Sequence, residues 1–272
     1  MRKKILSLLI IFKIFFASSV FAQQDSLFRF IHQIDIPVSS FTVDNIGELY
    51  IITPENQLKK YDEKGDSIGV FNEVTKYGKL AYVDAQNPWK TILFYQNFAT
   101  IVLLDKYLKV TTAINLRNQN IFQVRAVTSS YDNNIWLFDE QDNKLKKIDD
   151  NGSVLSETVD FRLLFDSGPD PKQIIDQDGF VYLYDPQKGI YIFDYYGTFK
   201  NKLTFLNWKS IAVIGKSIYG FDSENLYKYT PPLPDFTTIL LPSELQNSTS
   251  VKISNHKIYV LKNNRLSVYD LN

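Results

Sequence analysis

The sequence predicts an all-β protein that closes into a six-bladed β-propeller. One phrase recurs six times: a short apolar strand, a polar turn, a strand with an aromatic residue, a second turn, and a third strand that usually ends at Asp. A β repeat of roughly forty residues is typical of propellers, in which each copy forms one four-stranded blade. The second-strand aromatics that mark the copies are Tyr50, Phe94, Trp136, Tyr182, Tyr219 and Tyr259.

Closure of the ring is predicted from the two ends of the repeat region. The sixth copy stops at its third strand, residues 266–272, and no fourth strand follows in the sequence. The run 27–36 is strand-like and precedes the first copy without a partner of its own. We therefore expect this N-terminal strand to complete the last blade, which removes the open edges that would otherwise pair with another chain.

The turns carry the clearest local signal. Asp at the start of a turn accepts hydrogen bonds from backbone N–H groups, and Gly at its end supplies a positive φ. Residues 176–179 also resemble the opening of a calcium loop, but Gln187 stands where that loop needs Glu, so the turn interpretation is preferred. The Asp-x-x-Gly motifs are Asp44/Gly47, Asp62/Gly65, Asp149/Gly152, Asp176/Gly179 and Asp194/Gly197.

Near-continuous apolar runs within the strands, such as 135–138 and 190–193, indicate sheets that are buried on both faces. The 17 Tyr and 20 Phe residues are expected to pack between blades, with hydroxyl groups at the wet edge. A platform that stacks against sugars is the alternative. Residues 237–241 are expected to form the fourth strand of the fifth copy, and 159–171 an irregular loop.

The N-terminus predicts export. Residues 1–22 have a charged start, an apolar stretch broken by Lys13, and small residues at the end, as in a cleavable signal peptide. This stretch is too short and too interrupted for a good membrane span, and no Cys follows for lipid attachment. We expect a periplasmic or secreted protein whose single propeller domain comprises residues 23–272.

Composition excludes several classes of function. Without the first 22 residues the chain has 26 basic and 30 acidic residues, a net charge of −4, so no nucleic-acid partner is expected. There is no Cys for disulfides or thiolate metal sites, and no phosphate-binding glycine motif. His32 is placed in the closing strand and His256 in a turn, and neither has a second His at ligand spacing. No catalytic, metal-ligating or cofactor-binding residue is assigned.

The expected registration places the Asp-x-x-Gly turns on one tight, uniform face and the longer loops on the other. Because function usually lies on irregular loops held by a rigid scaffold, a partner is expected on the second face. Its loops are 53–56, 96–98, 140–143, 185–189, 223–225 and 262–264, with connections near Thr75, Asn118, Phe165, Asn207 and Ser243. The candidates for lining the central channel, where polar side chains would satisfy one another, are Thr42, Asp44, Tyr82, Asp84, Arg125, Gln173, Asp176, Lys252 and Ser254.

The phrase of copy one, residues 43–51 followed by 58–65, resembles blades of NHL-repeat and SMP-30/gluconolactonase-like propellers. Copies three and four also match well, and the resemblance spans residues 41–270. It implies the architecture. The lactonase branch would add a divalent metal held by Glu, Asn and Asp in the channel, and no such triad can be placed here. The Lys-, Ile-, Asn- and Phe-rich composition is similar to exported propellers of the Bacteroidetes type, some of which serve outer-membrane assemblies.

Together these observations favour a non-enzymatic, exported propeller that binds another protein. Its role would be that of a scaffold or an accessory subunit of an outer-membrane export or uptake assembly, with the chain monomeric on its own. The alternative is a propeller that binds a glycan or another small ligand. A metal-dependent, lactonase-like hydrolase is the third possibility.

Overall fold

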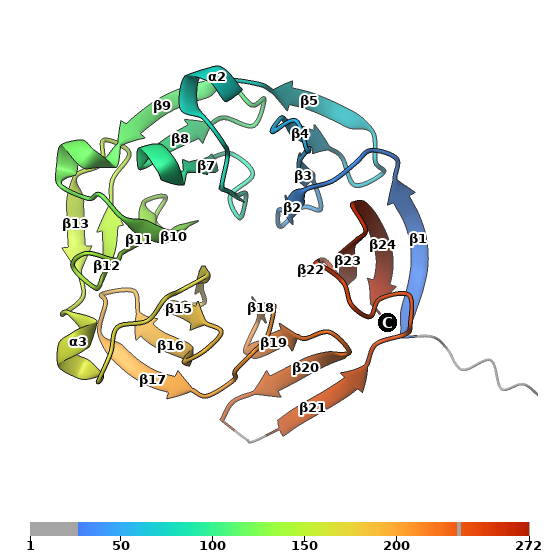
Figure 1. The fold of residues 1–272 in the computed structure, drawn as a ribbon. Coiled ribbons are helices and arrows are strands. Elements are labelled where there is room, and N and C mark those ends of the chain that lie inside the picture. The colour runs from blue at the N-terminus through green and yellow to red at the C-terminus, as the bar shows by residue number, and fades with distance from the viewer. Residues whose placement is uncertain (1–26, 233–234, 272) are drawn as a thin grey trace, which may run out of the picture.

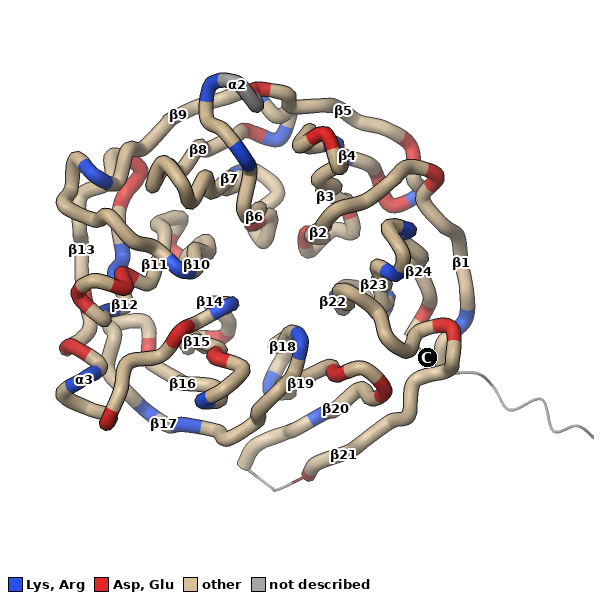
Figure 2. The backbone as a smooth tube through the Cα atoms, in the orientation of Figure 1, with Lys and Arg blue, Asp and Glu red and all other residues tan. Residues whose placement is uncertain are grey.

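A computed structural model of the chain describes residues 27–232 and 235–271, and it shows six four-stranded antiparallel sheets arranged as a ring (Figure 1). The predicted six-bladed propeller is therefore confirmed. The proposed signal peptide, residues 1–22, lies outside the described residues. Acidic and basic residues are interspersed around the ring (Figure 2).

Each blade runs outward from an innermost strand that borders the central channel. The first three blades consist of β2 (Ser40–Val43), β3 (Leu49–Ile52), β4 (Leu58–Tyr61) and β5 (Ser67–Phe71); β6 (Tyr82–Asp84), β7 (Thr91–Tyr95), β8 (Thr100–Leu104) and β9 (Val110–Asn115); and β10 (Val124–Ser129), β11 (Ile135–Asp139), β12 (Lys144–Ile148) and β13 (Val154–Glu157).

The last three blades follow the same order. They consist of β14 (Gln173–Gln177), β15 (Phe180–Asp185), β16 (Gly189–Asp194) and β17 (Phe199–Leu203); β18 (Ser210–Ile214), β19 (Ser217–Phe221), β20 (Asn225–Thr230) and β21 (Asp235–Leu240); and β22 (Ser250–Ser254), β23 (Lys257–Lys262), β24 (Arg265–Leu271) and β1 (Phe28–Ile34). The strand expected near 237–241 is thus β21.

Four short helical segments interrupt the loops of the described residues: α2 (Val74–Tyr77), α3 (Phe161–Leu164), η1 (Gln96–Phe98) and η2 (Leu116–Gln119). The segment 159–171, expected to be irregular, therefore contains one helical turn, which Asp160 caps by accepting from the Arg162 N–H at 2.8 Å. None of the helices that the structure describes is long and apolar enough to cross a membrane.

The N-terminal strand closes the ring as predicted. β1 pairs antiparallel with β24, with Phe28 opposite Leu271 and Ile34 opposite Leu266, and it forms the outer strand of the sixth blade (Figure 1). The innermost strands β2 and β22 contact each other, so the first and last blades are neighbours. Both ends of the described chain are therefore held in one sheet.

The hydrophobic core consists of six clusters, one between each pair of adjacent blades. Alternate residues of one strand enter different clusters. In β3, Leu49 and Ile51 pack against the sixth blade, whereas Tyr50 and Ile52 pack against the second. This alternation explains the continuous apolar runs in the sequence, because both faces of every sheet are covered by a neighbour.

The turns follow the predicted chemistry with one exception. Asp62 Oδ1 accepts from the N–H groups of Lys64 at 2.9 Å and Asp66 at 2.8 Å, and Gly65 has a φ of 92°. Asp176 differs, because Asp178 and Gly179 alone form a two-residue hairpin loop between Gln177 and Phe180. The Asp176 carboxylate is therefore free to reach the preceding blade.

Replacing Ile34 by Ala tests the closure. Ile34 is 5% exposed and packs with residues of the first and sixth blades, so the substitution should lower the free energy of unfolding by about 2–4 kcal/mol. Chemical denaturation followed by fluorescence measures this change. The matched control is Q33A, an exposed position on the same strand, for which about 0.5 kcal/mol or less is expected. Equal effects of the two substitutions would contradict the closure.

Candidate functional site

The ring has two faces with different loops. The turns between the first and second and between the third and fourth strands of each blade lie on one face, here called the turn face. The turns between the second and third strands and the connections between blades lie on the other, here called the connection face. As expected, the irregular segments α2, α3, η1 and η2 all belong to connection-face loops.

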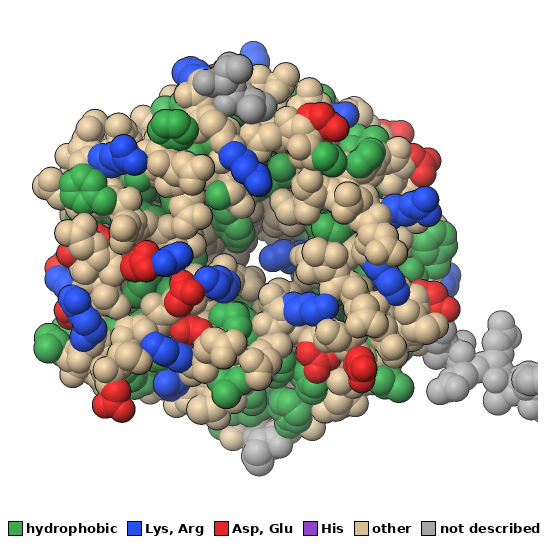
Figure 3. Space-filling view, viewed as in Figure 1, with side chains coloured by type: hydrophobic (Ala, Val, Ile, Leu, Met, Phe, Trp, Pro, Cys, Tyr) green, Lys and Arg blue, Asp and Glu red, His purple; other side chains and the backbone are tan. Residues whose placement is uncertain are grey.

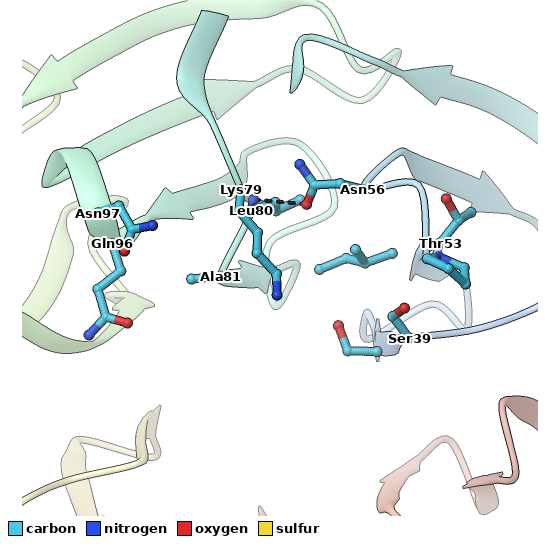
Figure 4. A pocket seen from close by; sticks show the side chains of 11 residues that line it. Ser39, Thr53, Asn56, Lys79, Leu80, Ala81, Gln96 and Asn97 are labelled. Atoms are coloured by element: carbon cyan, nitrogen blue, oxygen red, sulfur yellow. Dashed lines mark hydrogen bonds between the residues drawn. The ribbon is translucent and has the colours of Figure 1, made fainter. Parts of the chain in front are cut away.

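A cleft of about 420 Å³ opens on the connection face between the first and second blades (Figure 4). Its walls come from the start of β2, the β3–β4 turn, the connection before β6, and η1. Two of the loops expected to carry function, 53–56 and 96–98, thus meet at one site. The lining residues are Ser39, Ser40, Ile52, Thr53, Pro54, Asn56, Lys79, Leu80, Ala81, Gln96 and Asn97.

Asn56 holds the two walls of this cleft together. Its side-chain Oδ1 accepts from the Leu80 N–H at 2.9 Å, and its Nδ2 donates to the Gly78 carbonyl at 3.1 Å (Figure 4). Asn56 has a φ of 64°, a left-handed conformation that Asn adopts more readily than most residues. This clamp fixes the connection that carries Lys79.

Other polar groups of the cleft are available to a ligand. Among the described residues, the side chains of Ser39, Ser40, Lys79 and Asn97 have no hydrogen-bond or ion-pair partner. The cleft thus offers hydroxyl, amide and ammonium groups beside the apolar surface of Ile52 and Leu80. This combination suits a peptide segment or a sugar better than a purely apolar ligand.

Exposed apolar side chains also occur on the connection face. Leu163 is 80% exposed at α3, and Phe122 is 47% exposed in the connection before β10. Figure 3 shows apolar side chains spread over several blades of this face. The large apolar residues exposed on connection-face loops are Phe98, Phe122, Val159, Leu163, Leu164 and Leu206.

Basic side chains stand at the ends of the innermost strands, and Figure 3 shows several around the central opening. Arg125 pairs with Glu140 and, at 3.4 Å, with Asp170, and Lys172 lies 2.7 Å from the same Asp170. The Glu140 carboxylate raises the pKa of Arg125. Lys209 donates to the Ser248 carbonyl at 2.7 Å. These basic groups are mostly paired, unlike Lys79.

The channel itself contains a second cavity, of about 240 Å³. Two of the residues predicted for the channel lie elsewhere. Arg125 lines a smaller cavity of about 150 Å³ together with Lys172 and Gln173, and Asp176 lies between blades, outside both cavities. Placement in the channel was thus correct for most of the candidates. The residues among them that line the 240 Å³ cavity are Thr42, Asp44, Tyr82, Asp84, Gln173, Lys252 and Ser254.

The buried carboxylates of the inner strands join neighbouring blades. Asp84 Oδ2 accepts from the Ser129 N–H at 2.8 Å and from the Thr128 hydroxyl, both in the third blade. Asp176 Oδ2 accepts from Ser130 Oγ and Trp136 Nε1, each at 2.9 Å, and so joins the third and fourth blades. Burial raises the pKa of Asp176. Asp84 and Asp176 are therefore hydrogen-bonded to the neighbouring blade rather than across the channel, and their partners are not among the residues predicted for the channel.

Asp44 is the carboxylate with the most perturbed pKa near the cavity. It is 1% exposed, and burial raises its pKa to about 6, although the N–H groups of Glu48 and Ile46 favour the charged form. The adjacent Glu48 carboxylate adds to the increase. Asp44 therefore changes charge within a pH range that a protein experiences.

The histidines do not form a site. His32 lies in β1 and His256 in the β22–β23 turn, as expected. Burial and the Lys257 charge lower the pKa of His32. Among residues 27–232 and 235–271 no three His, Asp or Glu side chains lie close enough to hold a metal ion.

The turn face is less uniform than expected. It carries an aromatic arc, defined as Trp89, Tyr107, Tyr131, Tyr195 and Tyr196, in turns of the second, third and fourth blades. Trp89 is 68% and Tyr196 72% exposed. The Tyr131 and Tyr195 ring centroids lie 5.3 Å apart, and Lys106 Nζ lies 4.7 Å from that of Trp89. Sequence reasoning assigned the aromatics to inter-blade packing and missed this group, although each member lies within two residues of an Asp or Asn of a turn.

Comparisons with known proteins identify the class of protein, a six-bladed β-propeller, and nothing narrower. No protein-family model matches the chain, and no curated protein matches it by sequence. A catalytically inactive virginiamycin B lyase from Staphylococcus aureus, solved with quinupristin, has a TM-score of 0.61 at 14% identity, covering 90% of this chain and 88% of the lyase. The family and the exported type that the sequence resembles are not confirmed.

Two further structures show the same fold in proteins of other kinds. The Myceliophteria thermophila Cps50 (Swd1) β-propeller domain has a TM-score of 0.62 at 8% identity, covering 90% of this chain and 100% of that domain. BBS1N in complex with ARL6DN has a TM-score of 0.60 at 9% identity, covering 91% of this chain and 97% of that one. Likeness at such low identity shows the fold alone.

Removing the Asp44 carboxylate tests its raised pKa. As the pH rises from about 4 to 6, the unfolded chain ionises at Asp44 before the folded chain does, which lowers the stability of the wild type. D44N lacks this effect. Its stability relative to the wild type should therefore rise over this range by at most about 3 kcal/mol and level off above it.

Thermal or chemical unfolding at several pH values measures the difference. The matched control is D62N, which removes a turn carboxylate outside the channel. A direct titration of the Asp44 carboxyl carbon by NMR should give a midpoint near 6. A midpoint near the ordinary value of 3.8 would contradict the assignment.

Proposed function

We propose that this chain is a non-enzymatic, exported scaffold that binds another protein through the connection face. The observation that supports the proposal most strongly is the presence, on that face, of a cleft of about 420 Å³ together with exposed apolar side chains. Exposed apolar side chains with polar residues around them often mark a protein-interaction site. Structural neighbours include a propeller in complex with another protein, BBS1N with ARL6DN.

The docking surface would combine the cleft with Phe98 and Phe122, which lie on either side of η2 in the chain. Arg117 of η2 donates to the Asn97 carbonyl at 3.2 Å, so η1 and η2 are held together. A segment of the partner would enter the cleft beside Lys79, and apolar side chains of the partner would cover Phe98 and Phe122. Buried aromatic anchors of this kind carry most of the binding energy in protein interfaces.

Export rests on the sequence of residues 1–22, and the place of action follows from it. We propose that the partner belongs to an outer-membrane export or uptake assembly, in which this chain is an accessory subunit. The inter-blade packing described above gives the rigid frame that such a subunit needs.

Co-purification tests the docking surface. The tagged chain is recovered from the native envelope in mild detergent, and mass spectrometry identifies its partner, which is then expressed for a direct binding assay. F98A/F122A should weaken that binding by about tenfold or more. These positions are 55% and 47% exposed, so the fold should be retained.

The control is the turn-face double variant Y131A/Y196A, whose residues are comparably exposed at 63% and 72%. It should bind the partner as the wild type does. Recovery of the chain alone, or loss of binding only in the turn-face variant, would refute docking on the connection face.

A second candidate function, glycan binding, is favoured by the aromatic arc. Its rings offer flat apolar faces next to polar side chains, and Asn87 donates to Asn133 Oδ1 at 2.8 Å, which links the turns of the second and third blades. Flat rings with polar neighbours suit the alternating C–H and O–H groups of a sugar. On a glycan array, W89A/Y131A should lose any binding that the wild type shows, while F98A/F122A keeps it. Absence of glycan binding by the wild type would exclude this function.

A further inference from the structure

Lys252 of β22 is a basic residue of the channel without a partner. Its side chain lines the 240 Å³ cavity, and it makes no ion pair or hydrogen bond with any residue that the structure describes. Burial lowers its pKa, and the attraction of the Asp84 charge opposes this effect only partly. Lys252 is half-buried, and an ammonium group in a cavity wall without an ion-pair partner can accommodate an anionic ligand.

The carboxylates in the cavity wall form no ion pair with Lys252, and they accept hydrogen bonds from other groups. Asp44 Oδ1 accepts from Ile46 N–H at 3.0 Å and Glu48 N–H at 2.8 Å. Asp84 Oδ1 accepts from Gln86 N–H at 2.8 Å, and its Oδ2 faces the third blade. Neither residue lies within ion-pair distance of Lys252, since both side chains are held by backbone groups.

Some amide and hydroxyl groups of the wall are hydrogen-bonded within the protein, and others are free. Gln173 uses both ends of its amide on Ile211, with distances of 2.9 and 3.1 Å, and Ser254 donates to the Asp44 carbonyl at 2.9 Å. Among the described residues of the wall, the hydroxyls of Tyr82 and Thr42 have no partner. Burial and the Asp84 charge raise the pKa of Tyr82, which keeps its proton available for donation. The side-chain amides of Asn45 and Gln86 in the wall have no partner among the described residues either and offer acceptors as well as donors, so what the cavity lacks is a negative charge to pair with Lys252.

The charges and the apolar residues of the wall limit the class of ligand that fits the cavity. Asp44 and Asp84 are close enough to the cavity that a dianion would be repelled, whereas one negative charge can be neutralised by Lys252. Ile175, Ala212 and Val213 line the cavity from the fourth and fifth blades, across the ring from the first and second. The cavity thus has a polar side with one free cation and an apolar side.

We propose that the central channel binds a small monocarboxylate, with its carboxylate paired to the Lys252 ammonium and hydrogen-bonded to the Tyr82 hydroxyl, and with a short apolar tail against β14 and β18. This site is distinct from the connection-face cleft and does not depend on protein docking there. The ligand contributes one negative charge for Lys252, which no described residue of the wall pairs, and two oxygens that can accept from Lys252 and Tyr82.

Titration calorimetry with sodium butyrate tests the proposal, and butyramide serves as the neutral analogue of the same shape. The full chain should bind butyrate saturably and at least about tenfold more tightly than butyramide. K252M should lose at least about tenfold in butyrate affinity. The matched control K79M removes an unpaired lysine of the connection face and should bind butyrate as the wild type does.

Two further measurements separate binding from misfolding. K252M should unfold at a temperature no lower than the wild type, because the substitution removes an unpaired charge from the channel. In the wild type, butyrate affinity should increase as the pH falls from about 7 to about 6, where Asp44 gains a proton and butyrate is still charged, and decrease at high pH as Lys252 loses its own proton; Asp84 and Tyr82 are the other ionisable groups of the wall. The absence of saturable butyrate binding, equal affinity for butyramide, or full binding by a folded K252M would each overturn the proposal.

Discussion

The structure depends on the burial of both faces of every sheet by its neighbours. Each of the six clusters lies between two blades, so no blade contains a core of its own. Full burial of one aliphatic side chain contributes about 1.5–3 kcal/mol, and a missing blade would expose two such surfaces at once. The ring is stable only when closed, and β1 is therefore placed beside β24.

Closure of the ring also determines which hydrogen-bond partners the polar groups of the inner strands have. These strands border the channel, where backbone and side-chain polar groups need partners. Asp84 and Asp176 find them in the adjacent blade, so the inter-blade contact is apolar over most of its area and hydrogen-bonded near the channel. This arrangement leaves few polar groups unmatched. Lys252 stands out because it lies in the same wall and has no such neighbour.

The loops vary more than the strands do, and the two faces differ in what varies. On the turn face, the Asp carboxylate and a positive φ hold most turns to a short, repeated shape, and variation is left to the side chains, as in the aromatic arc. On the connection face, loop length and conformation vary, and helical segments and a cleft result. A rigid ring with one variable face suits the recognition of a partner.

The sequence by itself determined the number of blades, the strand order, the turn chemistry and the closing strand. These features follow from local rules and from a pattern repeated six times, such as the aromatic residues at Tyr50 and Trp136 and the Asp–Gly turn at 62–65. The channel candidates were also largely correct, because strand position fixes which residues come near the axis. The repeat could not predict the contacts of a residue that departs from the repeated pattern.

For residues that depart from the repeated pattern, only the tertiary structure decided where the side chains lie. Asp176 matches the turn motif, yet its carboxylate accepts from Trp136 of the preceding blade. The cleft at Asn56 and Lys79, the exposed rings of the aromatic arc and the unpaired ammonium of Lys252 each depend on residues from different blades. Sequence periodicity describes one blade at a time, whereas these features arise from the packing angle and spacing between blades, which no single repeat encodes.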